Sequence, residues 1–190
     1  MAKKYFWRYL MSSENVLTQL VSGRYYDEND TVAEIHDGAL VVIGGLEDHA
    51  VYANIKDLDT HKITMPKAVT DKVAIVDLVN VSEGRIQGEL YREGIKTAGL
   101  TVSAGIPVRV RRLVEGDKFY LATGNFNADV VVGEYAVPTA NSTLWTPSSE
   151  LVKDACGIKI LMEQPLVEGS INTDTKYFCM VEQVGTGITA

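Results

Sequence analysis

Residues 105–138, GIPVRVRRLVEGDKFYLATGNFNADVVVGEYAVP, decide the fold class of this chain. Apolar residues lie at positions 106, 108, 110 and 113, interspersed with arginines, and again at 119 and 121, and a third apolar run covers 130–137. Glycine, aspartate and asparagine separate the three runs. Because successive side chains of a strand point to opposite faces, this alternation is typical of half-buried antiparallel strands. The stretch therefore predicts a β-meander.

A hairpin is predicted on the N-terminal side of this stretch. Asp37-Gly38 lies between two apolar runs, and such a dipeptide is a strong signal for a two-residue turn, since both positions of a type I′ turn require positive φ. The predicted strands cover 31–36 and 39–44, and Gly44-Gly45 ends the second one.

The segment between this hairpin and the meander mixes connections with one buried strand. Residues 55–70 are predicted to be a connection, with Pro66 excluded from a central strand. The run 71–81 is apolar on both faces, which is expected of a strand buried from two sides. Glycines spread through 82–99 argue against a long helix and indicate a loop and short-strand excursion.

The C-terminal part completes the fold class. Two closing strands are predicted at 157–163 and 175–184, and the turn 167–174 joins them. All these segments together predict an all-β fold, or a β-rich one with one or two short helices, in which hairpins build an antiparallel sandwich or a barrel-like domain.

The predicted domain organisation is simple. Residues 1–22 form an N-terminal arm or segment, and 23–184 form a β-rich globular domain. A division of this domain into two sub-modules near 85–104 is left open. The last residues, 185–190, are predicted to be a flexible tail.

Size and charge exclude several classes of protein. With 190 residues the chain can bury roughly 70% of the surface exposed by its unfolded form, so its core needs no metal or disulfide. The formal net charge of −7 opposes contact with nucleic acid and with anionic membranes. No stretch approaches the roughly 20 apolar residues of a membrane span. Direct nucleic-acid binding and membrane association are therefore not expected.

The sequence carries no recognisable catalytic or cofactor motif. His36, His49 and His61 are too widely spaced for a local metal motif, and each is expected at the surface or in a turn. The acids of 27–37 lack the spacing of a calcium-binding loop. Nucleophile elbows, phosphate loops and dinucleotide fingerprints are absent. We therefore expect no enzyme, no catalytic residue, no metal site and no cofactor.

The cysteines and the arginines of 109–112 are expected to have structural roles or to face a partner. Cys156 and Cys179 form no metal-ligand pattern and lie in apolar surroundings, so buried thiols are predicted rather than a disulfide. Arg109 and Arg111 should share one face of a strand and Arg112 the other, which predicts a stripe that faces a partner or the solvent.

Two places are candidates for partner binding. The first is a positive, aromatic segment near the N-terminus, and the second is a tryptophan in a loop rich in proline, serine and threonine. Aromatic residues and arginine commonly anchor interfaces. In each case the alternative is packing against the chain's own domain. The candidate residues are Lys3, Lys4, Tyr5, Phe6, Trp7, Arg8 and Trp145.

Five segments resemble a family of tailed-bacteriophage structural proteins in their order and in the placement of their turns. They are HDGALVVIGGLE (36–47), DKVAIVDLVNVSEG (71–84), LYREGIKTAGL (90–100), AGIPVRVRRLVEGDKFYLATGNF (104–126) and VGEYAVPTANSTLWTPS (132–148). The resemblance covers roughly 36–183, and the N-terminal part departs from it.

The resemblance implies an auxiliary capsid protein, of the decoration or head-stabilising kind, that binds the outside of the phage head. It implies the major capsid protein as partner, self-association, and a place in the virion after synthesis in the cytoplasm of a bacterial host. The family has no catalytic residues to carry over. Two other functions stay open: a subunit of the phage tail tube or baseplate, and a β module that binds glycans or a receptor.

Overall fold

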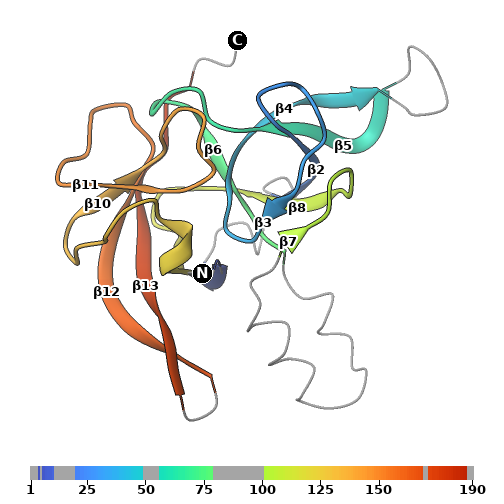
Figure 1. Cartoon of the computed structure of the whole chain (residues 1–190). Coiled ribbons are helices and arrows are strands. Elements are labelled where there is room, and N and C mark those ends of the chain that lie inside the picture. Colours follow the sequence, from blue (N-terminus) through green and yellow to red (C-terminus); the bar gives the residue numbers. More distant parts are fainter. Residues whose placement is uncertain are drawn as a thin grey trace.

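The computed structural model of the chain describes residues 4, 6–10, 20–48, 56–78, 101–168 and 171–187. Within these ranges the fold is all-β, as predicted, and the single helical segment is the short 3-10 helix η4 (Thr123–Asn125). The strands form a closed barrel and a six-stranded sheet that lie side by side (Figure 1). Both architectures that the sequence left open, a barrel and packed sheets, are present.

The barrel contains five strands, four from the N-terminal half and one, β8, from the opening stretch. Its strands run in the order β2-β5-β4-β6-β8 and close back onto β2. All neighbours are antiparallel except β2 and β5, which are parallel. The bounds are Leu20–Tyr26 (β2), Leu40–Asp48 (β4), Lys56–Thr64 (β5), Val73–Val76 (β6) and Val108–Arg112 (β8).

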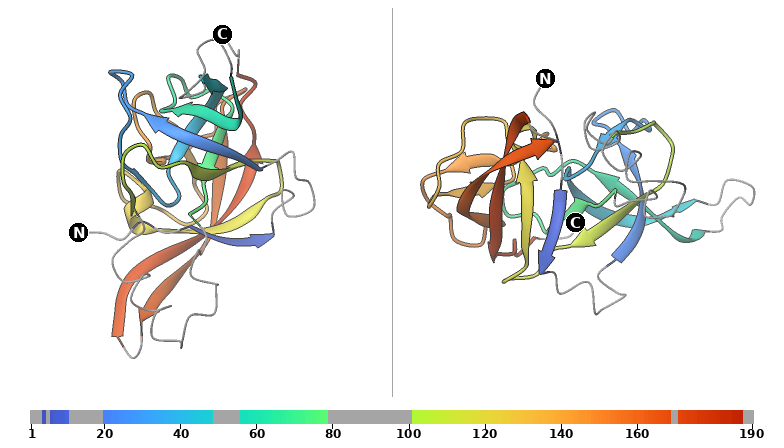
Figure 2. Two further views of the ribbon diagram at one scale, coloured as in Figure 1. Left: turned by 90° about the vertical axis from the view of Figure 1, so that its right-hand side faces the viewer. Right: turned by 90° about the horizontal axis from the view of Figure 1, so that it is seen from below.

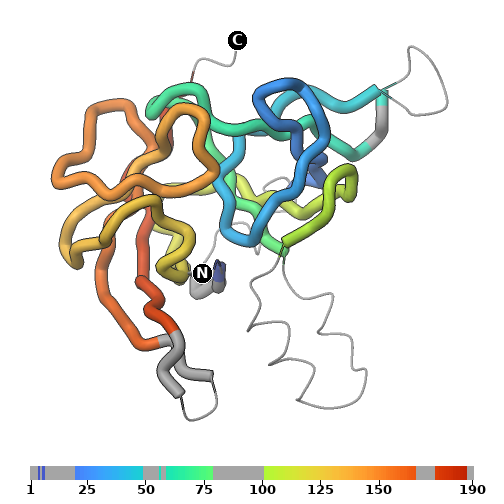
Figure 3. The backbone as a smooth tube through the Cα atoms, in the orientation of Figure 1, coloured from blue at the N-terminus to red at the C-terminus, as the bar shows by residue number. Residues whose placement is uncertain are grey.

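The six-stranded sheet joins the first described strand, β1, to strands from residue 118 onward. Its order is β1-β9-β13-β12-β10-β11, and all neighbours are antiparallel. Figure 3 follows the backbone from the blue and green barrel into this yellow-to-red sheet. The bounds are Phe6–Leu10 (β1), Lys118–Ala122 (β9), Tyr135–Val137 (β10), Thr146–Ser148 (β11), Gly157–Glu168 (β12) and Ile171–Gln183 (β13).

Two hydrophobic cores share the strands β4 and β6. Val41, Ala74 and Val76 point into the barrel, whereas their neighbours Leu40 and Ile75 pack with the inner face of the six-stranded sheet. All four residues of β6 are buried. The prediction of a strand buried from two sides is thereby confirmed, because one face of β6 lines the barrel and the other lies against the sheet.

The predicted meander contains real strands with a different pairing. Strands β8, β9 and β10 lie within the opening stretch, but β8 pairs with β2 and β6 in the barrel, and β9 pairs with β1 and β13 in the sheet. The turn between β8 and β9 explains the divergence. Gly116 has a φ of 87° and donates its amide to Val181 O at 2.9 Å, so the chain leaves the barrel and joins β13. The meander prediction is wrong in its connectivity.

The predicted hairpin around Asp37-Gly38 is also wrong. Gly38 has a positive φ of 72°, but Asp37 does not, so the turn is not of type I′. The strand before the turn, β3 (Ile35–His36), pairs with β7 (Thr101–Val102) in a separate two-stranded sheet. After the turn, β4 pairs with β6 and β5 instead.

Strand boundaries also differ from the predictions in the middle of the chain. Strand β4 does not end at Gly44-Gly45 but continues to Asp48 across a register shift. A Cβ atom on Gly44 would lie 2.9 Å from Lys62 O, so glycine lets the two backbones approach there. Residues 56–64, expected to be a connection, form the nine-residue strand β5. The predicted excursion 82–99 lies outside the described residues.

The closing strands are confirmed and are longer than predicted. Strands β12 and β13 pair along nearly their whole length, and the end of this hairpin extends beyond β9, which pairs only with Lys176–Met180 (Figure 2). The predicted flexible tail is corrected for 185–187. Gly185 is buried, and Gly187 donates its amide to Thr70 O at 2.8 Å.

Candidate functional site

The predicted N-terminal arm is in part a strand of the sheet. Residues 6–10 form the edge strand β1, in which Trp7 lies opposite Tyr120 and Arg8 opposite Phe119. Phe6 is only 4% exposed and its ring lies 5.3 Å from that of Phe119, so it belongs to the core and not to a partner-binding surface. Among the other candidates, Lys3 and Tyr5 lie outside the described residues.

Lys4 and Trp145 differ in how far they are buried. Lys4 is half-buried, and this burial lowers the pKa of its ammonium group. Trp145 is fully buried, because backbone hydrogen bonds to Asn125 and Asn127 hold its segment against the core. The prediction of Trp145 as an exposed partner contact is therefore corrected, and its alternative, packing on its own domain, is what the structure has.

A buried carboxylate holds the two assemblies together. Asp37 accepts hydrogen bonds from the Phe6 amide at Oδ2 and from the Leu78 amide at Oδ1, both at 2.9 Å. Its backbone carbonyl accepts another from Asn125 Nδ2 at 2.8 Å. Burial raises the pKa of Asp37 to about 7, although the hydrogen bonds from Leu78 and Phe6 oppose this shift. The residue thus ties β1 and η4 to the barrel.

His36 completes this node. Its Nδ1 donates to the carbonyl oxygen of Asp37 at 3.0 Å, and its Nε2 accepts from the Thr143 hydroxyl at 3.2 Å. Burial lowers the pKa of His36 to about 4. The expectation of a surface histidine is wrong here, because both ring nitrogens have partners inside the protein. The hydrogen bonds give His36 and Asp37 a structural role at the junction.

A second buried charge cluster joins the barrel strand β8 to the residue that follows β6. Asp77 is 1% exposed and pairs with Arg111, which is equally buried; Arg109 Nη2 lies 3.4 Å from the same Asp77 oxygen. Arg109 and Arg111 do share a face, as the alternation predicts, but this face meets Asp77. For Arg111 the predicted stripe toward solvent or a partner is corrected to an internal ion pair, whereas the Arg109 side chain is 40% exposed.

The remaining chemistry-bearing residues do not converge on a site. Cys156 and Cys179 are free and buried, which confirms the thiol prediction, and burial raises both thiol pKa values. His61 Nδ1 contacts Gly44 O at 2.9 Å, and His49 lies outside the described residues. Within the described ranges no three histidine, cysteine or acidic side chains are grouped as a metal site would require.

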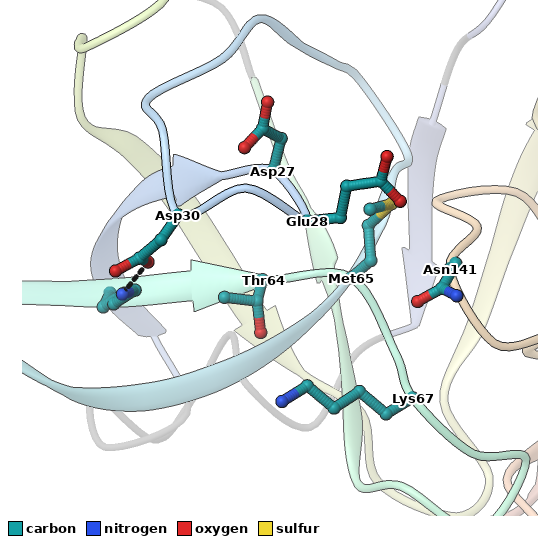
Figure 4. A pocket seen from close by; sticks show the side chains of 8 residues that line it. Asp27, Glu28, Asp30, Thr64, Met65, Lys67 and Asn141 are labelled. Atoms are coloured by element: carbon teal, nitrogen blue, oxygen red, sulfur yellow. Dashed lines mark hydrogen bonds and ion pairs between the residues drawn. The ribbon is translucent and has the colours of Figure 1, made fainter.

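One hollow of about 330 Å³ combines acids and lysines (Figure 4). Asp27 and Asp30 lie on one side of it, and Lys67 on another. The carboxylates already have local partners: Asp27 Oδ1 accepts from the Thr31 amide at 3.0 Å, and Asp30 pairs with Lys62. These contacts fix the turn after β2 and do not form a catalytic arrangement.

The six-stranded sheet has a chemically distinctive outer face. Directly opposed residues of antiparallel strands point to the same side, so the pairing register places side chains in rows. One row contains Tyr120, Phe178 and Met162. The neighbouring rows on the same side of the sheet add six more residues. We call these residues the outer sheet face: Lys118, Tyr120, Tyr135, Lys159, Met162, Gln164, Lys176, Phe178 and Met180.

Aromatic rings and lysines are interleaved on the outer sheet face. The rings of Tyr120 and Phe178 lie 4.8 Å apart. Lys176 Nζ lies 4.7 Å from the centre of the Tyr120 ring, and Lys159 Nζ lies 5.6 Å from that of Tyr135. Met162 is 39% exposed, and the other members are half-buried. A surface of this kind offers apolar contact and positive charge at the same place.

The sequence contains only a weak signal for this face. Lys118 and Tyr120 alternate with core residues in β9, as do Lys176 and Phe178 in β13. The alternation shows that each pair shares a side of its strand, but not that the two strands are neighbours. The face becomes visible only when the register is known.

Within the described residues no helix has the length and apolarity needed to cross a bilayer. Comparison of the chain with models of protein families, with curated proteins and with solved structures gives no match.

Proposed function

We propose that this chain is a virion structural protein, an auxiliary capsid protein that binds the outside of a phage head and stabilises its lattice. The outer sheet face is the observation that supports the proposal best. It is a broad surface of half-buried aromatic, methionine and lysine side chains on an otherwise acidic chain. Aromatic and methionine side chains are enriched where one protein binds another.

The role needs a surface and no catalytic pocket. A protein that binds only the assembled lattice stabilises it by mass action, at about 2.7 kcal/mol per site when its free concentration is a hundred times Kd. Many copies on one head multiply this effect. The major capsid protein is the partner in this proposal, self-association of the bound copies is expected, and no catalytic role is assigned.

The proposal changes the contact residues expected from the sequence. Phe6 and Trp145 are removed, because both lie in the core. Lys3, Lys4 and Tyr5 precede β1, which lies at the edge of the same sheet as the outer sheet face. We keep them as contact candidates together with Trp7 and Arg8.

The test uses phage heads assembled without this chain. The purified chain is mixed with these heads and pelleted, and the heads are then heated with and without it. We expect saturable co-sedimentation and a higher temperature of head disruption. A chain that stays in the supernatant at micromolar concentrations, or that polymerises into tubes by itself, contradicts a capsid role; tubes indicate a tail component.

A further inference from the structure

We infer that the outer sheet face binds an acidic segment of protein that also carries apolar side chains. The inference rests on the proposed function, since it states the chemistry of the head surface to which the chain would bind. It also makes a claim about this face that can be tested without heads.

Charge is the first argument. The chain has a formal net charge of −7, yet the outer sheet face contains Lys118, Lys159 and Lys176 and no acid. Asp174 and Glu182 are the next alternate residues of β13, one at each end of this face. The three lysines outnumber these two flanking acids, so the sign of the face is still opposite to that of the whole molecule. Charge complementarity selects an acidic partner and orients its approach.

The positions of the lysines are the second argument. Lys176 and Lys159 hold their ammonium groups over the rings of Tyr120 and Tyr135, at 4.7 and 5.6 Å from the ring centres. A carboxylate that meets either ammonium group therefore arrives beside an aromatic surface. Apolar neighbours of that carboxylate can pack on Phe178 and on Met162, which is 39% exposed. The face thus fits acidic and apolar residues in close succession.

Nucleic acid fits this face less well. A strand of phosphates needs a continuous positive groove, and its affinity grows with the number of phosphates that are neutralised. Only three cations lie in the rows of the outer sheet face, and the net charge of −7 repels a polyanion at longer range. Methionines such as Met162 suit protein contacts better than base stacking.

Charge reversal tests the inference. The face variant combines Lys118→Glu, Lys159→Glu and Lys176→Glu. A matched control variant changes three lysines that are exposed elsewhere: Lys67→Glu, Lys72→Glu and Lys153→Glu. Both variants have the same net charge, so a difference between them reports position and not overall charge. A Lys→Gln triple at the three face positions serves as a milder variant, and thermal unfolding verifies that each variant folds.

The first measurement is binding to heads that lack the chain. We expect the face variant to bind at least about tenfold more weakly than the unchanged chain, and the control variant to bind within about threefold. If the unchanged chain binds and the face variant binds equally well, the inference is overturned while the proposed function stands.

The second measurement needs no heads. The chain is titrated with a synthetic peptide of repeated Glu-Glu-Leu and, separately, with a 12-nucleotide oligothymidylate. We expect binding of the peptide, weakened in the face variant, kept in the control variant and reduced by salt. Absence of peptide binding overturns the inference, whether or not heads bind. Tighter binding of the oligonucleotide, lost in the face variant, assigns the face to nucleic acid and also overturns it.

Sedimentation velocity tests whether the face binds a second copy of this chain. If the unchanged chain forms a homo-oligomer that the face variant loses and the control variant keeps, the face binds a second copy of the chain. That result overturns the inference of a separate acidic partner.

Discussion

At the scale of single residues, the junction between barrel and sheet depends on two buried groups with opposite pH responses. Asp37 binds its proton more tightly in the folded chain, with a pKa of about 7 against an ordinary 3.8. Its contribution to stability is therefore lost as the pH rises toward 7. His36 has a folded pKa of about 4 against an ordinary 6.5, so its contribution is lost as the pH falls from 6.5 toward 4.

The two effects should largely cancel in the unchanged chain between pH 4 and 6.5. We expect His36→Gln to make the free energy of unfolding fall with rising pH, and Asp37→Asn to make it rise, each by on the order of 3 kcal/mol across the window. Urea unfolding at several pH values measures the slope. If both variants keep the pH profile of the unchanged chain, the opposing pH responses do not come from Asp37 and His36.

Trp145 is expected to stabilise the core by packing alone, because its side chain makes no hydrogen bond within the described residues. The residue is fully buried, and its Nε1 has no hydrogen-bond partner in the described structure. Trp145→Ala should lower the free energy of unfolding by about 3–5 kcal/mol, because it leaves a cavity. Trp145→Phe removes no hydrogen bond and should cost less than half as much. Equal losses in denaturant titrations would show that the indole N–H has a partner after all.

At the scale of elements, strands β6 and β8 of the barrel meet at an ion pair. Arg111 lies opposite Ile75 and pairs with Asp77, and both charged residues are buried. Arg111→Met should cost about 3–5 kcal/mol, because it leaves a carboxylate in the interior. Asp77→Leu combined with Arg111→Met should cost clearly less than the sum of the two single changes. Additive costs in a double-mutant cycle would mean that the pair is not coupled.

The C-terminal segment depends on the absence of one side chain. A Cβ atom at Gly185 would lie 2.3 Å from Asp71 O and 2.4 Å from Thr70 O. We expect Gly185→Ala to destabilise the chain by about 1–3 kcal/mol and to speed hydrogen exchange at the Gly187 amide. Gly45→Ala is the control, since nothing lies within 4 Å of its Cβ position. Similar effects of both changes would refute the close approach.

The individual strands show how much of the fold could be predicted from the sequence. Apolar patterns located β6, β8, β9, β12 and β13, with a run apolar on both faces marking β6. They missed β5, where the exposed Lys56 and Asp59 mask the pattern. They also misassigned the partners of β8 and β9, since consecutive strands pair with different sheets. Pairing over long distances leaves no local signal, and the outer sheet face depends on such pairing.

At the scale of the whole molecule, barrel and sheet should unfold together. Leu40, Val73 and Ile75 are barrel residues that pack in the core of the sheet, and Asp37 bonds to both assemblies. We expect one calorimetric transition whose van't Hoff and calorimetric enthalpies agree. Leu40→Ala should lower the single midpoint without splitting it. Two resolved transitions would show that the assemblies are independent.

The place of β1 has a consequence for biosynthesis. Phe6–Leu10 leaves the ribosome well before its partner strand Lys118–Ala122 and the next strand, β13. During translation the segment has no edge on which to dock, and its aromatic residues stay available to chaperones until the C-terminal hairpin has been made. The sheet that we propose as the binding surface is thus completed after the strands of the barrel have been made.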